Sequence, residues 1–318
     1  MTTQPLHLTI QDNTDDRLDL ALSKLLPDYS RSQLKTWIDA GNVLLNGKPA
    51  KGKTKVKFGD QIEVTAIAKP ALTYEAENIP LNIVHEDDDV LIINKPAGLV
   101  VHPGAGNQTH TLLNALLHHA PHLKHLPRAG ILHRLDKDTT GLLVIAKNEA
   151  ALKSLSKQLK DKSMQREYQT IVSGTLVSGG TVDAPIDRHH QQRTRMAVTD
   201  TGKTAVTHYR VLQKFRAHTH LKLMLETGRT HQIRVHMAHI RHPIIGDPTY
   251  GGRMQLMKNT TPELTQALRH IKRQALHAFA LGFVHPSTHE DVRYEIPLPE
   301  DMQTLLTQLK DDTEKNSA

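Results

Sequence analysis

The sequence predicts an α+β protein with two domains, and three observations lead to this prediction. The chain has 318 residues, which exceeds the length at which a single hydrophobic core stops growing. Residues 80–306 alternate short apolar strands with helices in an order that favours a mixed, mostly antiparallel sheet over a doubly wound parallel one. Residues 15–70 have the pattern of a small helix–helix–hairpin unit. Residues 67–80 carry two prolines and no periodicity, which predicts a linker.

Two helices and two hairpins are expected in the first domain. The stretch "RLDLALSKL" repeats its apolar residues at helical spacing. Ser30 and Gln33 in "SRSQLKTWI" have the spacing of a capping box, which predicts the start of a second helix. The stretch "NVLLNGKPA" predicts a strand that ends in an Asn46-Gly47 turn. The stretch "KVKFGDQIEV" predicts a hairpin that turns at residues 59–60.

Basic side chains gather in this first domain. A small module with one basic face suits a phosphate backbone, and a merely solvated lysine face explains the same composition equally well. The candidate RNA-binding residues are Arg31, Lys35, Lys48, Lys51, Lys53 and Lys55.

The second domain begins with "DVLIINKPAG", which predicts a buried strand, and "HTLLNALLHH", which predicts a helix. Two apolar strands around a charged turn are expected in "GILHRLDKDTTGLLVIAK", followed by an amphipathic helix in "EAALKSLSKQLKDK". "REYQTIVSG", "AVTHYRVLQ" and "HLKLMLETG" alternate as strands. "RTHQIRVHMAHI" predicts a helix that turns Ile233, Met237 and Ile240 inward. We expect the charged tail after Leu309 to fray.

Composition limits the classes of function. A formal net charge of +7 favours a polyanionic partner, either nucleic acid or an anionic membrane, although a merely soluble basic protein has the same charge. The sequence has no apolar run of about 18 residues and no secretory signal pattern, so we expect no membrane span and no export. Cysteine is absent, which excludes disulfides, thiolate metal sites and a cysteine nucleophile and fits a cytoplasmic location.

Charged residues crowd the segment just before the apolar run 142–146. A carboxylate held at the end of a buried strand is well placed for chemistry. Asp136 has Arg134 two residues before it, and Arg234 in "HQIRVH" is a second possible partner that would keep it ionised and oriented. A charged turn between strands is usually only a turn. From the residues alone, Asp138 rivals Asp136 as the nucleophile.

A family resemblance changes this balance. "HRLDKDTTGLLVIAK", "REYQ" and "ETGRTHQIRVHMAHIRHPIIGDPTYG" resemble, in order and spacing, the three motifs of the RluA-type pseudouridine synthases, and "INKPAGLVVHPGAGN" resembles their early motif. The first domain resembles the small RNA-binding module of a ribosomal small-subunit protein. "PDYSRSQLKTWI", "VVHPGAGN" and "RQALHA" look most like the members that act on large-subunit ribosomal RNA. The resemblance covers residues 15–305.

The resemblance implies a pseudouridine synthase fold and roles for five residues. Asp136 of HRLD is the implied nucleophile, and whether it attacks the ribose or assists glycal formation stays open. Tyr168 of REY is implied to stack on the base and to handle the carbon-5 proton. Arg234 of QIR is implied to pair with the aspartate. Arg134 is implied to fill the space of the flipped-out uridine, and Ile233 to form an apolar wall.

The other candidates have simpler explanations. His133, next to the implied nucleophile, could act as a base, but we expect it to orient the loop and contact the substrate. His236 and His239 are three residues apart without a HExxH pattern or interleaved carboxylates, so we expect no metal. "GAGN" predicts a tight turn because a third glycine is missing from a phosphate-loop pattern. Asp247 in "GDPTY" is expected to be a turn residue near the site.

The sequence thus predicts a cytoplasmic RNA isomerase, without cofactor, that converts uridines in large-subunit ribosomal RNA to pseudouridine. We expect ribosomal RNA in a pre-ribosomal particle as the partner, with no membrane and no obligate protein partner. Two alternatives stay open. The same chemistry could act on a transfer RNA or on other ribosomal uridines, because RNA shape and loop contacts set the target. A non-catalytic RNA-binding assembly protein could use the same basic faces.

Overall fold

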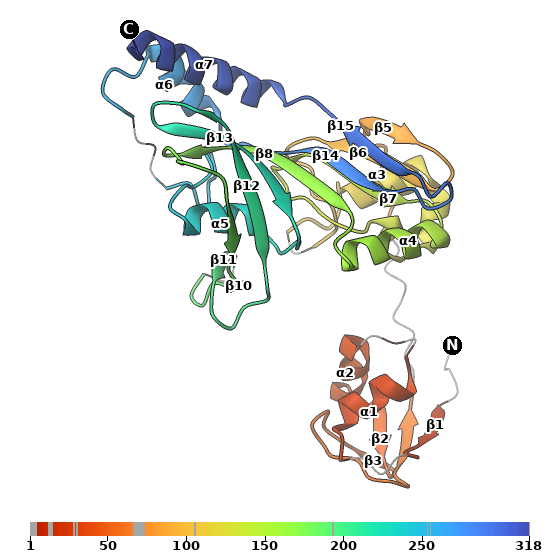
Figure 1. Ribbon diagram of the computed structural model, residues 1–318. Helices are drawn as coiled ribbons and strands as arrows, with labels where there is room; N and C mark the ends of the chain where they lie inside the picture. Colours follow the sequence, from red (N-terminus) through yellow and green to blue (C-terminus); the bar gives the residue numbers. More distant parts are fainter. Residues whose placement is uncertain are drawn as a thin grey trace. The chain divides into compact units, whose positions relative to one another are not determined.

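Buried apolar side chains form one core before residue 66 and further cores after residue 74. The computed structural model (Figure 1) divides accordingly into two units, Met1–Thr73 and Tyr74–Ala318. The side chains of Ser32 and Gln33 are not described. The described residues are 5–11, 15–27, 29, 31–65, 74–104, 106–192, 194–252, 254 and 256–317.

The first unit packs two helices on a small antiparallel sheet with strand order β1-β4-β2-β3. Leu18 and Leu22 of the first helix meet Leu34 and Trp37 of the second, and all four are buried. This agrees with the helical spacing of the apolar residues. The elements are α1 (Leu18–Leu25), α2 (Arg31–Asp39), β1 (Leu6–Thr9), β2 (Val43–Leu45), β3 (Lys48–Pro49) and β4 (Gln61–Val64).

The expected second hairpin of this unit is wrong in its first half. Residues 55–58 form no strand, and Phe58 is 66% exposed. Strand β4 pairs with β1 and β2 instead. The pairing with β1 joins distant parts of the sequence, so no local turn signals it. The expected capping residue Ser30 lies outside the described residues.

The second unit is built on a mixed sheet with strand order β5-β6-β7-β14-β8-β13-β12-β9, and β15 pairs with β14. Strand β7 runs parallel to β14, and the other neighbours in the described sheet are antiparallel, so the predicted sheet type is confirmed. The strands are β5 (Ile83–Glu86), β6 (Val90–Lys95), β7 (Thr140–Ala146), β8 (Gln165–Ser173), β9 (Gly180–Asp183), β12 (Val206–Lys214), β13 (His218–Leu225), β14 (Leu276–Val284) and β15 (Asp291–Glu295), with a separate hairpin of β10 (Ile186–Arg188) and β11 (Met196–Val198).

Helices cover both faces of this sheet. Because strand residues alternate between faces, Leu91 and Ile93 of β6 belong to the main core with the first helix, α3, while Val90 and Ile92 pack with the second, α4. Burial on both faces explains why β6 and β7 are apolar throughout. The helices are α3 (Leu112–His119), α4 (Glu149–Lys160), α5 (Gln232–His239), α6 (Pro262–His270) and α7 (Glu300–Ser317), with short 3-10 turns η1 (Pro121–His125) and η2 (Pro127–Gly130).

The expected frayed tail is wrong. Helix α7 continues to Ser317, and Leu309 is buried in the main core. Asp312 is also buried, where it accepts a hydrogen bond from the Arg216 guanidinium at 2.9 Å and one from the Thr261 amide at 2.7 Å. The charged residues of this tail suggested exposure to solvent. One of them, Asp312, instead forms an ion pair with Arg216 that anchors the helix.

The expected linker is wrong in its second half. Residues 66–73 lie outside the described part of the chain, but residues 74–80 belong to the second unit, and Tyr74 packs against its main core. There the Asn114 side-chain amide donates to the Glu75 carbonyl at 2.7 Å. No helix in the described part of the chain is both long enough and apolar enough to cross a membrane.

Candidate active site

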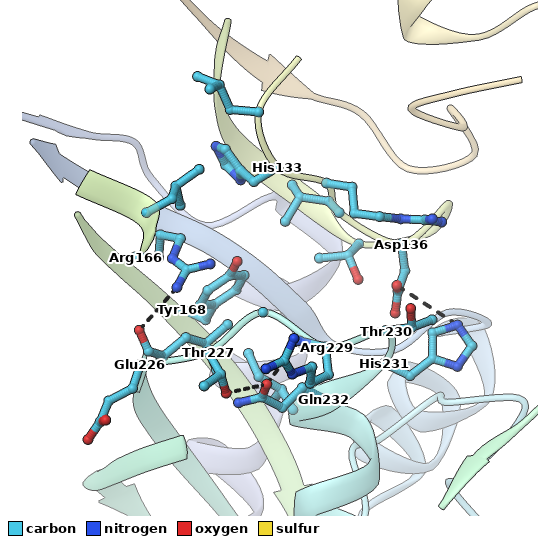
Figure 2. Close-up of a pocket in the computed structure, with 18 of the residues that line it drawn as sticks. His133, Asp136, Arg166, Tyr168, Glu226, Thr227, Arg229, Thr230, His231 and Gln232 are labelled. Atoms are coloured by element: carbon cyan, nitrogen blue, oxygen red, sulfur yellow. Dashed lines mark hydrogen bonds and ion pairs between the residues drawn. The ribbon is translucent and has the colours of Figure 1, made fainter. Parts of the chain in front are cut away.

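A cleft of about 590 Å³ in the second unit brings together three stretches that lie far apart in the sequence. The loop before β7, the start of β8 and the segment from the end of β13 into α5 all line it (Figure 2). Every candidate site residue of this unit lines the cleft. They are His133, Arg134, Asp136, Tyr168, Ile233 and Arg234.

An ion-pair chain fixes Asp136 at this cleft. The Nη1 atom of Arg234 donates to Asp136 Oδ2 at 2.9 Å. The Nε and Nη2 atoms of the same guanidinium donate to the two oxygens of Asp247, at 2.7 and 2.9 Å. The side chains of Arg234 and Asp247 are 6% and 0% exposed, whereas that of Asp136 is 16% exposed. Asp247 thus fixes the arginine from the buried side. The remaining nitrogen of the guanidinium donates to Asp136, whose carboxylate faces the cleft.

The same contacts set the charges. Burial acts to lower the pKa of Arg234, but hydrogen bonds and attraction from Asp247 and Asp136 outweigh it, so the pKa is raised. Burial acts to raise the pKa of Asp247, but the Arg234 guanidinium and the backbone amides of Tyr250 and Thr249 outweigh it and keep the pKa below its usual value. Both groups are therefore charged near neutral pH.

Asp136 lies in a loop, not at the end of a strand. The apolar run before it makes a single bridge, between Ile131 and Ile145, so the expected strand there is wrong. Two charged residues hold the loop. Lys95, which is fully buried, donates through Nζ to three backbone carbonyls at 2.7–2.9 Å, including that of Lys137. Arg273 Nη1 contacts the Asp138 carbonyl at 3.3 Å.

Burial lowers the pKa of Lys95 to about 8 against the attraction of Asp138 and Asp136. Its three hydrogen bonds go to carbonyls that belong to two separate loops. A buried ammonium that has such partners ties these loops together more firmly than a neutral donor would. The position of Asp136 therefore depends on a charged group that does not itself line the cleft.

Tyr168 lies on β8, opposite Leu223 of β13 and Ala278 of β14, and is 6% exposed. Burial raises the pKa of its hydroxyl. The positive charge of Arg166 opposes this rise, and the negative charge of Asp136 adds to it. The phenol is therefore neutral at physiological pH. Figure 2 shows the ring facing the cleft between Arg166 and Asp136.

His133 and Arg134 differ in environment. Burial and the charge of Arg166 lower the pKa of His133 to about 3. Its Nε2 faces the Val144 amide at 3.3 Å, where it accepts a hydrogen bond as a neutral ring. The Arg134 side chain is exposed at the cleft, and Asp136 has its described arginine contact with Arg234. The partner first considered for Asp136, two residues before it, is therefore not the one that the fold provides.

Sequence reasoning missed three groups at the site. Asp247 does form the expected turn, through the amides of Thr249 and Tyr250, but it also fixes Arg234. His231 adopts a left-handed backbone (φ 56°) before α5, and its Nε2 lies 3.9 Å from Asp136 Oδ1. Arg166 lines the cleft, and its spacing from Tyr168 on one strand is the signal that could have found it.

His236 is held by hydrogen bonds inside the fold. Both ring nitrogens of His236 have partners, the Thr207 hydroxyl and the Ala184 carbonyl, each at 2.9 Å. Among the described residues, Asp87, Asp89 and His285 could offer three metal-ligand atoms close together. They lie outside the cleft.

In the first unit, the candidate RNA-binding residues are exposed. Two of them have acidic neighbours. Arg31 contacts Asp19 at 3.5 Å, and Lys55 pairs with Asp15. The other four are Lys35, Lys48, Lys51 and Lys53.

Relatives with curated names resemble this chain over almost its full length. It is 55% identical over 297 residues to the ribosomal large subunit pseudouridine synthase D of Pasteurella multocida, covering 93% of this chain and 92% of the relative. It is 50% identical over 313 residues to the protein of that name from Escherichia coli, covering 98% and 96%. The chain belongs to the pseudouridine synthase family.

Matches to families and solved structures agree with this membership. Residues 89–239 match the RNA pseudouridylate synthase family, and residues 16–62 match the S4 domain. The structure titled human RNA pseudouridylate synthase domain containing 4 is 27% identical with a TM-score of 0.57, covering 72% of this chain and 93% of that one. The one titled human RNA pseudouridylate synthase domain containing 1 is 25% identical with a TM-score of 0.53, covering 74% and 96%.

Removing the carboxylate that holds Arg234 should destabilise this synthase. Because Asp247→Ala leaves a buried guanidinium with half of its partners, we expect the free energy of unfolding to fall by about 3–5 kcal/mol. Urea unfolding measures this. The control is Glu295→Ala, which removes a 57% exposed carboxylate from its pair with Arg293 and should cost no more than about 1 kcal/mol. Equal losses for the two variants would contradict the buried-anchor role of Asp247.

The pH dependence of the same contact has a defined sign. The folded-state pKa of Asp247 lies below its unfolded value. Its stabilisation is therefore fully present above the ordinary aspartate pKa and is lost as the pH falls through the lowered one. Asp247→Ala should accordingly lose less stability to acid than the unaltered protein.

Proposed function

We propose that this protein isomerises uridine to pseudouridine in large-subunit ribosomal RNA. One observation supports this function most: the carboxylate of Asp136 is paired with Arg234 and faces a cleft that Tyr168 also lines. The relatives named above carry a ribosomal large subunit substrate in their names. A non-catalytic RNA-binding protein has no need of this arrangement.

The residues take the following roles in the proposed reaction. Asp136 acts on the ribose of the target uridine as the glycosidic bond breaks. Arg234 keeps this carboxylate ionised and in one orientation at 2.9 Å. The Tyr168 ring supports the uracil, and its hydroxyl handles the carbon-5 proton. Ile233, which is 4% exposed, forms part of the apolar wall.

The target uridine must leave its stack to reach this cleft, at a cost of a few kcal/mol. The exposed Arg134 is placed to occupy the vacated space and to contact phosphates. Stacking of the flipped base on an aromatic ring such as Tyr168 is worth about 1–3 kcal/mol. The neutral His133, bonded to the strand amide of Val144, orients the loop that carries Asp136.

The two units divide the work. Residues 80–306 carry the reaction, and residues 15–70 anchor the RNA through the basic residues of α2 and of the segment 48–55. The S4 match and the exposure of these side chains support the anchor role. The reaction uses no cofactor, because proton transfer and an aspartate are sufficient for it. The setting we propose is a pre-ribosomal particle in the cytoplasm.

A triple variant tests the anchor. Replacing Lys48, Lys51 and Lys53 by glutamine should weaken binding to ribosomal RNA and flatten its salt dependence. Each lost phosphate contact should change the log–log slope by about 0.9 in duplex RNA or about 0.7 in single strands. Filter binding across a salt series measures both quantities. Turnover at saturating RNA should persist.

The matched control removes equal charge from the second unit. It replaces Lys258, Lys310 and Lys315, which are exposed, by glutamine. The control should change the slope less than the test variant does. If the test variant leaves affinity and slope unchanged, the lysines of the first unit are merely solvated and the anchor role is refuted.

Mapping pseudouridines in the RNA of cells with and without the gene tests the substrate. We expect specific large-subunit sites to revert to uridine in the absence of the gene and to return with it. Loss confined to transfer RNA would replace the proposed substrate and keep the chemistry. No change in any RNA would favour the non-catalytic alternative.

A further inference from the structure

Arg166 lines the cleft but has no role in the reaction proposed for Asp136, Arg234 and Tyr168. It lies two residues before Tyr168 on β8, so the two side chains project from the same face, about 6.7 Å apart along the strand. The residue is 8% exposed and lines the cleft. Figure 2 shows it on the side of Tyr168 away from Asp136.

The donors of this guanidinium are largely unused. Its Nε is buried without a hydrogen-bond partner, and its Nη2 reaches the Leu225 carbonyl only at 3.5 Å. Among the described residues, no carboxylate forms an ion pair with it. The nearest acids in the sequence and the cleft have other partners: Glu167 contacts Lys222 and Arg293, and Glu226 contacts Lys162.

This arrangement is costly for a folded protein. A buried charge without a partner lowers stability by several kcal/mol, and buried guanidinium groups are normally paired. Arg234, at the other side of the same cleft, has two carboxylates. The contrast indicates that Arg166 is held ready for an anion that the protein itself does not supply.

Two neighbouring residues suit an unpaired guanidinium, one because it leaves room and the other because it carries no charge. A methyl group added at Gly228 would come within 2.9 Å of Arg166 Nη1, so the glycine leaves room for the guanidinium. His133 is neutral, with a pKa near 3 that burial and the charge of Arg166 both lower. It therefore adds no positive charge beside the arginine.

We propose that Arg166 binds the uracil carbonyl edge and stabilises the negative charge that the base carries when it leaves the ribose. This inference rests on the proposed function. With the ribose at Asp136 and the base along Tyr168, the far edge of the base points toward Arg166. The cleft then provides a carboxylate for the sugar and a guanidinium for the departing base.

The step balances within the nucleotide. The bond between carbon 1′ and N1 breaks, and its electron pair stays on the uracil, where it spreads over N1, O2 and O4. The base turns, and carbon 5 forms the new bond to carbon 1′. The carbon-5 proton leaves to the general base and N1 takes up a proton, so the product is an isomer of the substrate. A guanidinium in a water-poor site stabilises such an anion much more strongly than it stabilises the neutral base.

The test compares two RNAs under single turnover at saturating protein. Arg166→Met should slow consumption of the target uridine by about 10²–10³-fold, the usual effect of removing one donor to a developing oxyanion. On the same RNA with 5-fluorouridine at that position the loss should be at least about tenfold smaller. Because fluorine by itself stabilises the uracil anion, the rate on this RNA should depend less on the guanidinium, and removing the guanidinium should slow it less.

Methionine suits this test because it is as long as much of the arginine and needs no hydrogen bonds. Removing a poorly paired charge should leave the melting temperature of the RNA-free protein equal or higher. If the variant melts below the assay temperature, Arg166→Lys is measured on the same two RNAs and the same ratio decides. The control is Arg210→Met, an exposed arginine of β12 outside the cleft lining, which should retain the rate on both RNAs.

The outcomes separate the two proposals. An unaltered protein active on both RNAs, with an equal loss in Arg166→Met on each, would refute the role of Arg166 alone. An unaltered protein inactive on both RNAs would refute the proposed function and this inference with it. A larger loss on the uridine RNA than on the 5-fluorouridine RNA is the expected result.

Discussion

Asp136→Asn is expected to abolish isomerisation while leaving RNA affinity nearly unchanged. Asparagine keeps the shape of the side chain and can still face Arg234, but it loses the charge that we propose acts on the ribose. Removing a catalytic nucleophile typically lowers turnover by on the order of 10⁴-fold or more. Most affinity for RNA comes from phosphate contacts, which the substitution does not touch.

The measurement is a single-turnover rate from nucleoside analysis, combined with a binding titration. The matched control is Asp138→Asn, the same chemical change two residues away and outside the cleft lining. It should retain turnover within about tenfold, because its carboxylate does not face the substrate. If Asp136→Asn stayed within tenfold of the unaltered protein, or if Asp138→Asn were the inactive variant, the assignment would be wrong.

Tyr168→Phe should reduce turnover strongly with near-normal RNA binding. Phenylalanine keeps the buried ring and its stacking but lacks the neutral hydroxyl, to which we assign the carbon-5 proton. Losing a general acid–base group lowers rates by about 10²–10⁴-fold. If the hydroxyl acts after the glycosidic bond has broken, an intermediate should accumulate on the RNA.

Rapid quenching followed by nucleoside analysis measures both the rate and the intermediate. Tyr294→Phe, on β15 and outside the cleft lining, is the matched control and should keep the normal rate. An unchanged rate in Tyr168→Phe would mean that this tyrosine only stacks and that another group moves the proton.

Local patterns of the sequence predicted the elements that form locally. The apolar spacing of "EAALKSLSKQLKDK" corresponds to α4, and the alternation of "REYQTIVSG" corresponds to β8. This strand also explains why Tyr168 faces the cleft, since alternate residues share one face of a strand. The family motifs named His133, Arg134, Asp136, Ile233 and Arg234, and the fold brings these residues together around one cleft.

Long-range pairing explains what the sequence did not predict. One of the two partners of β4 is β1, which no turn connects to it. The charged tail is a docked helix because Asp312 forms an ion pair with Arg216, which lies almost a hundred positions earlier in the sequence. The ion pair between Asp247 and Arg234 was missed for the same kind of reason, since "GDPTY" has a sufficient local explanation as a turn. Charge alone does not distinguish a solvated side chain from one that has a distant partner.

Tritium release from large-subunit ribosomal RNA labelled at carbon 5 of uridine tests whether the protein isomerises uridine in this RNA. Forming pseudouridine replaces the carbon-5 hydrogen by the new bond to the ribose, so each isomerised uridine releases its label to water. We expect the purified protein to release tritium from a fixed number of sites in each molecule of this RNA, and Asp136→Asn to release none. An unaltered, RNA-binding protein that releases no tritium would contradict it.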